Sequence, residues 1–227
     1  MPSNAFAIRD DASYTLEGFM RLITTYKVSS NTNSMTFHPD ELTECGRKII
    51  YRKRNHKCHF CNNAEYSYDK FAKCRWISLL KQCSDIKVLD SDILANDMKY
   101  DVVTKIDCVI EIPSMDDLQT VVYIRSIPSS IFENVKKNGA LRKDIVRIMT
   151  DMWLIELING MIIYEDRDSL DFIIYSVLPQ NAVINSIKAR AKQLYEHLIN
   201  TTIPLRPYKN HDTKECGECE FFKMCWE

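Results

Sequence analysis

The spacing of apolar residues divides the chain into helices and strands. Apolar side chains three and four residues apart predict helices at residues 12–27, 67–83, 141–158 and 181–200. A further helix is expected to begin at residues 37–42, where Pro39 is followed by acidic residues, and to end in the basic run 52–54. Those cations suit a helix C-terminus and equally suit contact with phosphates.

Runs rich in β-branched residues predict two hairpins. The first pairs residues 102–112 with 120–127 across a turn, and the second pairs 161–164 with 172–177. Gly160 is expected to cap the helix that precedes the second hairpin. This order of elements predicts an α/β (α+β) domain in which helices flank a central mixed sheet.

The C-terminal tail carries three closely spaced thiols, Cys216, Cys219 and Cys225. A Cys-x-x-Cys turn can present two thiolates to one metal centre, and a third Cys nearby can join them, so a fourth ligand must come from elsewhere. We expect a metal or cluster to fasten the tail onto a distant part of the fold. The alternative is a set of buried or disulfide-bonded cysteines.

A second Cys-x-x-Cys, formed by Cys58 and Cys61, is flanked by two histidines. By itself it is half of a zinc site. It could pair with Cys216 and Cys219 as a zinc ribbon, use a nearby His together with another cysteine of the following helix, or bind no metal.

Composition narrows the class of protein. The chain has 227 residues, nine cysteines and a formal net charge of −1, so nucleic-acid binding would have to come from local patches. Neither a signal peptide nor an apolar run of membrane-spanning length is visible, which predicts a cytoplasmic protein without a membrane partner. Because the cytosol keeps thiols reduced, so many cysteines favour metal ligation. Few Gly and many Ile, Asn and Lys suggest an AT-rich genome, such as that of a virus or phage.

The segment His38-Pro-Asp-Glu-Leu-Thr-Glu-Cys45-Gly-Arg-Lys-Ile-Ile-Tyr51 resembles the opening helix of RecB-like exonucleases of the PD-(D/E)xK superfamily. One branch, which includes the nuclease of CRISPR adaptation, joins that early Cys to a C-terminal Cys-x-x-Cys-x5-Cys in an iron–sulfur cluster. The tail has this spacing. The resemblance therefore implies a four-iron four-sulfur cluster, or zinc in its place, held by Cys45, Cys216, Cys219 and Cys225.

The resemblance covers residues 36–227 and implies a restriction-endonuclease-like core, with residues 1–35 as an N-terminal helix and loop. The family's chemistry needs an acid on one strand and Glu-x-Lys on the next, because two carboxylates hold magnesium and the Lys acts on the attacking water. Asp107 matches the first acid. The Glu and Lys positions hold Tyr123 and Arg125.

Neither residue replaces the family's chemistry. A phenol titrates near pH 10 and brings no charge to magnesium, and Arg holds its proton too tightly to act as a base. The expected Gln positions on the following helix hold Arg147 and Met149, and the helix near Cys74 lacks the family's His. Glu111 lies about 13 Å along the strand from Asp107, too far to share one ion. Magnesium is expected only if the chain is active.

We therefore predict a catalytically degenerate, nuclease-fold protein that binds DNA or serves as a subunit of a replication, recombination or transcription complex. Its nucleic-acid contacts are expected at Arg47, Lys48, Arg125 and Arg147. The alternative is an active magnesium- or manganese-dependent DNA exonuclease with a second carboxylate elsewhere. A second alternative is a zinc-ribbon interaction module.

Overall fold

The computed structural model describes residues 35–54, 63–115 and 117–226. Their centre is one five-stranded sheet, whose strands lie in the order β1 (Lys87–Asp97), β2 (Val102–Ile112), β3 (Leu118–Ile127), β4 (Gly160–Asp166) and β5 (Phe172–Val177). β3 and β4 run parallel, and the other neighbours run antiparallel. The mixed sheet that the sequence predicts is thereby confirmed. The predicted helix at 12–27 lies outside the described residues.

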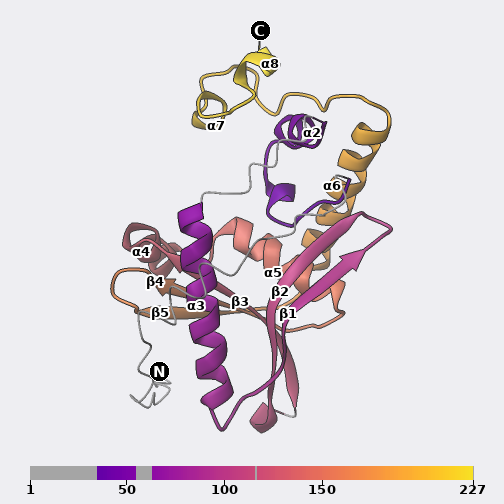
Figure 1. Ribbon diagram of the computed structural model, residues 1–227. Coiled ribbons are helices and arrows are strands. Elements are labelled where there is room, and N and C mark those ends of the chain that lie inside the picture. Colours follow the sequence, from indigo (N-terminus) through magenta and orange to yellow (C-terminus); the bar gives the residue numbers. More distant parts are fainter. Residues whose placement is uncertain (1–34, 55–62, 116, 227) are drawn as a thin grey trace. The chain divides into compact units, whose positions relative to one another are not determined.

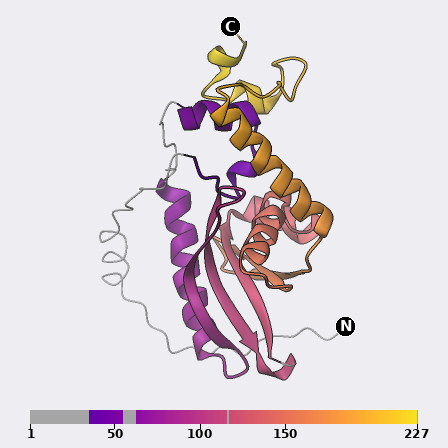
Figure 2. The same ribbon diagram turned by 90° about the vertical axis from the view of Figure 1, so that its right-hand side faces the viewer.

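Helices cover both faces of the sheet. On one face lies α3 (Asn63–Gln82), and on the other lie α4 (Ser129–Asn138), α5 (Arg142–Leu154) and α6 (Asn181–Ile199). Figure 2 shows the strands between these two layers. The connection from β3 to β4 runs through α4 and α5, as parallel neighbours require a crossover.

The two faces have separate cores because β3 alternates its side chains between them. Val121 and Tyr123 face the larger core, which α5 and α6 share, whereas Val122 and Ile124 face the core under α3. Trp76 ties α3 to the sheet, since its indole nitrogen donates to the buried Glu165 carboxylate on β4 at 2.7 Å. The middle strands are thus fixed from both sides.

Four short elements gather at one end of α6 (Figure 1). They are the 3-10 turn η1 (Glu41–Thr43), α2 (Gly46–Arg54), α7 (Lys214–Gly217) and α8 (Phe222–Trp226), whereas a second 3-10 turn, η2 (Pro113–Met115), connects β2 to β3. Where the sequence predicts one helix from residue 37 onward, the backbone is extended at Glu44 and divides it into η1 and α2. Within the described ranges, no helix is long and apolar enough to cross a membrane.

The bounds and number of elements differ from the sequence expectations at several points. β1 and α4 were not predicted, and α5 ends at Leu154 rather than at residue 158. The prediction that Gly160 caps this helix is wrong, because Gly160 opens β4 and pairs with Val121 and Val177. A Cβ at Gly160 would lie 2.6 Å from Met152 Sδ, so the glycine is there to let α5 pack closely on β4.

Candidate functional site

Asp107 lies where β2 and β3 separate. Their pairing runs from Ile112↔Leu118 to Cys108↔Val122, and beyond it the Asp107 side chain takes the place of a strand partner. Its Oδ2 accepts a hydrogen bond from the Ile124 amide at 2.8 Å, and its Oδ1 lies 2.5 Å from Lys73 Nζ. With only 1% of Asp107 exposed, this carboxylate is held by the protein's own groups.

A second acid, Asp69, comes to the same edge of β3 from helix α3. Its Oδ1 accepts a hydrogen bond from the Ser126 amide at 2.9 Å. Because Ile124 and Ser126 are two residues apart, their amides point the same way, toward the side that β2 has left. Burial raises the pKa of Asp69, and the nearby Asp107 adds to this effect while Arg125 opposes it. Two carboxylates therefore lie close enough to repel each other.

Asp69 and Lys73, both on α3, are site residues that the sequence analysis missed. They lie one helical turn apart and face β3 and β2 respectively. The only signal in the sequence is an Asp and a Lys four residues apart, and this spacing is equally common on exposed helices that have no functional site. The family's His was sought on this helix, and the structure instead brings an Asp and a Lys to the site.

Tyr123 and Arg125 occupy the positions where the resemblance requires Glu and Lys. Tyr123 belongs to the larger core, which α5 and α6 share, and Arg125 is half-buried beside it. The Arg125 guanidinium donates to the Tyr123 hydroxyl at 3.1 Å and lies 3.7 Å from Asp69 and 3.8 Å from Asp144. Burial raises the pKa of Tyr123, so the phenol stays neutral. Burial would lower the pKa of Arg125, but Tyr123, Asp69 and Asp144 outweigh it and keep the guanidinium charged. This pair supplies a cation, not a ligand for magnesium.

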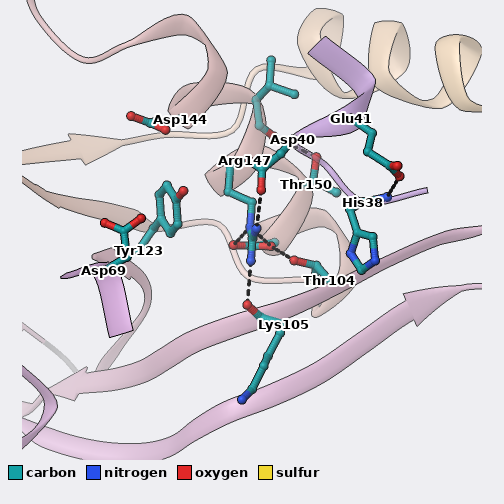
Figure 3. Close-up of polar contacts among 12 residues, drawn as sticks. His38, Asp40, Glu41, Asp69, Thr104, Lys105, Tyr123, Asp144, Arg147 and Thr150 are labelled. Atoms are coloured by element: carbon teal, nitrogen blue, oxygen red, sulfur yellow. Dashed lines mark hydrogen bonds and ion pairs between the residues drawn. The ribbon is translucent and has the colours of Figure 1, made fainter. Parts of the chain in front are cut away.

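Arg147 is the centre of a buried polar network beside Tyr123 (Figure 3). Its Nε donates to both carboxylate oxygens of Asp151, at 3.2 and 3.1 Å, and its two other nitrogens donate to Asp40 at 3.2 Å and to the Lys105 carbonyl at 2.6 Å. Thr104 completes the arrangement by donating to Asp151 at 2.7 Å. The guanidinium thus joins α5 to β2 and to the residue before η1.

The Asp151 carboxyl should make stability depend on pH. Burial raises the pKa of Asp151 to about 6, although Arg147 and Thr104 oppose this shift. In the unfolded chain the pKa is about 3.9, so the folded state binds this proton more tightly. The contribution of Asp151 is therefore fully present below pH 4 and is lost as the pH rises through 6. We expect the free energy of unfolding of the wild type, relative to Asp151→Asn, to fall by about 2 kcal/mol from pH 4 to pH 7.

Urea unfolding of both proteins at the two pH values measures this difference. The wild type and the variant share every other titrating group, so their shared pH dependence cancels. A difference that stays constant or rises with pH would contradict the raised pKa of Asp151.

The tail returns to helix α2, as the sequence analysis expected of a fastening segment. The rings of Tyr51 and Phe221 lie 5.6 Å apart, the Tyr51 hydroxyl donates to the Met224 carbonyl at 3.3 Å, and Arg52 lies 3.4 Å from Glu220. The tail is also closed on itself, since Arg206 donates to the Cys225 carbonyl. These contacts connect the beginning of the domain to its end.

The four predicted cluster cysteines lie in these same elements. Cys45 immediately precedes α2, Cys216 lies in α7, Cys219 follows it and Cys225 lies in α8; all four are half-buried. None of the cysteines within the described ranges forms a disulfide.

The four predicted ligands are all cysteines, the donor type of iron–sulfur clusters and of thiolate zinc sites. Within the part of the chain that the structure describes, no three His, Cys, Asp or Glu side chains are placed to hold one metal ion. The cluster stays a prediction, and Cys58 and Cys61 lie outside the described residues.

The predicted nucleic-acid contacts are engaged inside the protein. Arg47 donates to the Tyr51 hydroxyl at 2.9 Å, and Lys48 lies 3.1 Å from Glu44. Arg125 and Arg147 have the internal partners described above, and their side chains are only 19% and 11% exposed. A phosphate at any of these positions would compete with an existing partner. The basic run 52–54 is likewise engaged, with Glu41, Glu44 and Glu220 and with backbone carbonyls.

Solved structures share this arrangement of strands and helices. An alkaline exonuclease from Laribacter hongkongensis superposes with a TM-score of 0.56 at 11% identity, over 74% of this chain and 89% of that one. The protein SSO0001 gives a TM-score of 0.57 at 16% identity, over 92% and 95%. The chain has a nuclease-like fold. The restriction-endonuclease-like core expected from the sequence is thereby confirmed.

The same exonuclease has also been solved in complex with dAMP, and that structure superposes equally well, with a TM-score of 0.56. Comparison of the sequence with protein-family models and with curated proteins gave no match. Structural similarity at 11% and 16% identity shows the fold alone, and the function depends on the residues of the site.

Proposed function

We propose that this chain is a nuclease-fold protein that binds nucleic acid, DNA in the first place, without cleaving it. It would act as a subunit of a replication, recombination or transcription assembly, such as that of a virus or phage. The observation that carries this proposal is that both oxygens of the Asp107 carboxylate already have partners. Its two oxygens are engaged by Lys73 and the Ile124 amide, so a magnesium ion would have to displace an ammonium group from a buried carboxylate.

The residues around Asp107 support the same conclusion. Magnesium in phosphoryl-transfer sites is held by one or two carboxylates together with the substrate phosphates. Here the next strand offers Tyr123 and Arg125, and Arg125 already lies within 4 Å of both Asp69 and Asp144. An uncompensated buried charge costs several kcal/mol, so these ion pairs resist being opened. The charged groups of the site are thus already engaged with one another.

The likeness to an exonuclease whose complex with dAMP has been solved supports nucleic acid as the ligand of this fold. In this proposal Cys45, Cys216, Cys219 and Cys225 hold an iron–sulfur cluster. Its thiolate bonds would cross-link α2 to the tail. The contacts of Tyr51 and Arg52 with the tail then orient the two elements before the cluster forms.

A second function, metal-dependent nuclease activity, is favoured by Asp69. Together, Asp69 and Asp107 place two carboxylates along one edge of β3, and Lys73 adds an amine beside them. These are the residue types that hydrolysis with magnesium uses, although two of them come from α3 rather than from β3. The side chains of Asp69 and Lys73 are 27% and 23% exposed, so solvent reaches them.

One experiment separates the two functions. The purified protein is incubated with single- and double-stranded DNA in Mg²⁺ or Mn²⁺, while binding is followed by fluorescence anisotropy. We expect binding without cleavage, because Lys73 already neutralises Asp107. Asp107→Asn and Asp69→Asn are run alongside, since each keeps an oxygen that can accept the β3 amide hydrogen bond.

Cleavage that is present in the wild type and lost in both Asn variants would overturn the non-catalytic proposal and establish the second function. Cleavage that persists in both variants would indicate a contaminating nuclease. Absence of any DNA binding would overturn the assignment of nucleic acid as the ligand.

A further inference from the structure

The end of α4 and the start of α5 together carry four exposed cations within eight residues. We name this segment the basic elbow, and it comprises Lys136, Lys137, Arg142 and Lys143. Lys136 lies 3.7 Å from Glu133, but both side chains are at least 60% exposed, so this pair contributes little. Asp144, the acid next in the chain, is buried and faces Tyr164 and Arg125. The elbow therefore presents a local positive charge on a chain of nearly zero net charge.

Helix stability explains only half of this charge. Lys136 and Lys137 lie in the last turn of α4, where cations complement the helix dipole. Arg142 and Lys143 lie in the first turn of α5, where the dipole disfavours cations and favours anions. The N-cap residue, Leu141, offers no side-chain hydrogen bond to this helix end. Two cations are thus placed where an external anion, not the helix, would stabilise them.

The elbow is held rigidly and lies next to the candidate site. The Leu141 amide donates to the Tyr164 hydroxyl at 3.1 Å, and that hydroxyl donates to Asp144 at 2.7 Å. Asp144 in turn lies 3.8 Å from Arg125. On the α4 side, Tyr175 donates to the Val135 carbonyl at 2.7 Å. Gly139, at the bend, has φ +91° and open space around the position of a Cβ.

We propose that the basic elbow contacts the phosphate backbone of the nucleic acid bound by this fold. This proposal rests on the proposed function. It assigns the phosphate contacts to exposed cations instead of to Arg125 and Arg147, which the sequence predicted. Phosphate contacts are sequence-independent and release counterions, so the elbow should add affinity and salt dependence without base preference. Four cations along one bend suit a backbone with regularly spaced charges.

Two double variants test the elbow against a control of equal charge. Lys136→Gln/Lys137→Gln and Arg142→Gln/Lys143→Gln each remove two elbow charges. Lys81→Gln/Lys192→Gln removes two exposed charges from α3 and α6. Binding of labelled single- and double-stranded oligonucleotides is measured by anisotropy over a series of salt concentrations.

For duplex DNA, each elbow variant should reduce the slope of log K against log salt by about 1.8, because each phosphate contact contributes about 0.9. The control should keep the slope of the wild type. If the wild type binds DNA and both elbow variants keep its salt slope, the basic elbow does not contact phosphate. The proposed function would stand in that case. An equal reduction in the control would overturn the elbow as well, because the effect would then follow net charge. A wild type that binds neither form of DNA would overturn the proposed function, and with it the elbow.

Discussion

Cys45→Ser is expected to abolish binding of the predicted metal cluster and to lower the free energy of unfolding by several kcal/mol. The binding free energy of a structural metal site is part of the folding free energy, since the unfolded chain holds no preformed site. Cys45 is the one predicted ligand outside the tail, and it immediately precedes α2, to which the tail returns through Tyr51 and Phe221. Without Cys45, the tail would still have the aromatic, hydrogen-bond and ion-pair contacts of Tyr51 and Arg52.

The measurement compares anaerobically purified proteins by metal content, visible absorption and urea unfolding. Cys74→Ser is the matched control, because Cys74 is an exposed cysteine on α3 and is not one of the four cysteines of the predicted cluster. Iron with broad visible absorption would support the cluster, whereas colourless protein containing zinc would favour the zinc alternative. A Cys45→Ser protein with full metal content and the stability of its parent would show that Cys45 is not a ligand.

The core of the fold could be predicted because its elements carry strong local patterns. β2 and β3 are rich in Val and Ile and are buried on both faces, and their predicted bounds lie within two residues of those observed. β1 was missed for the opposite reason. It is an edge strand with several acidic residues and little burial, so no alternation of apolar and polar residues marks it.

α4 was missed because only two of its residues, Phe132 and Val135, are buried. A ten-residue helix with one pair of buried side chains gives too short a pattern to recognise. The error at Gly160 has another cause. A glycine after a helical run is read as a cap, but here close packing of α5 on β4 requires it, and packing is invisible in one sequence.

Part of the candidate site could also be predicted from the sequence. Asp107 could be found because a strand motif marks it, and the position of Asp107 identified Tyr123 and Arg125 on the neighbouring strand. Asp69 and Lys73 reach it from a helix more than thirty residues earlier in the chain, so only the fold brings them together. Arg147 was predicted to meet phosphate because it is an Arg near the expected groove. Its two acidic partners are Asp40, which lies far earlier in the chain, and Asp151, which lies one turn away on the same helix, and spacing alone does not pair them with Arg147.

Arg147→Met is expected to lower the free energy of unfolding by about 3–5 kcal/mol, the usual cost of breaking a buried ion pair by removing one partner. Met keeps much of the apolar stem of Arg147 but none of its charge. Asp151, which is fully buried, would lose the ion pair and keep the hydrogen bond from Thr104, and the hydrogen bond from Arg147 to the Lys105 carbonyl would be lost as well. Urea unfolding at pH 7, followed by circular dichroism, measures the loss.

The double variant Arg147→Met/Asp151→Asn separates charge from packing. It removes the carboxylate that Arg147→Met leaves uncompensated, while Asn retains an acceptor for Thr104. Residues in direct contact couple by up to about 3 kcal/mol, so the double variant should be more stable than the sum of the two single losses implies. DNA binding by this double variant should keep the salt slope of the wild type, because the guanidinium serves the fold. An Arg147→Met protein as stable as the wild type, but with a lower salt slope, would instead show that Arg147 meets phosphate.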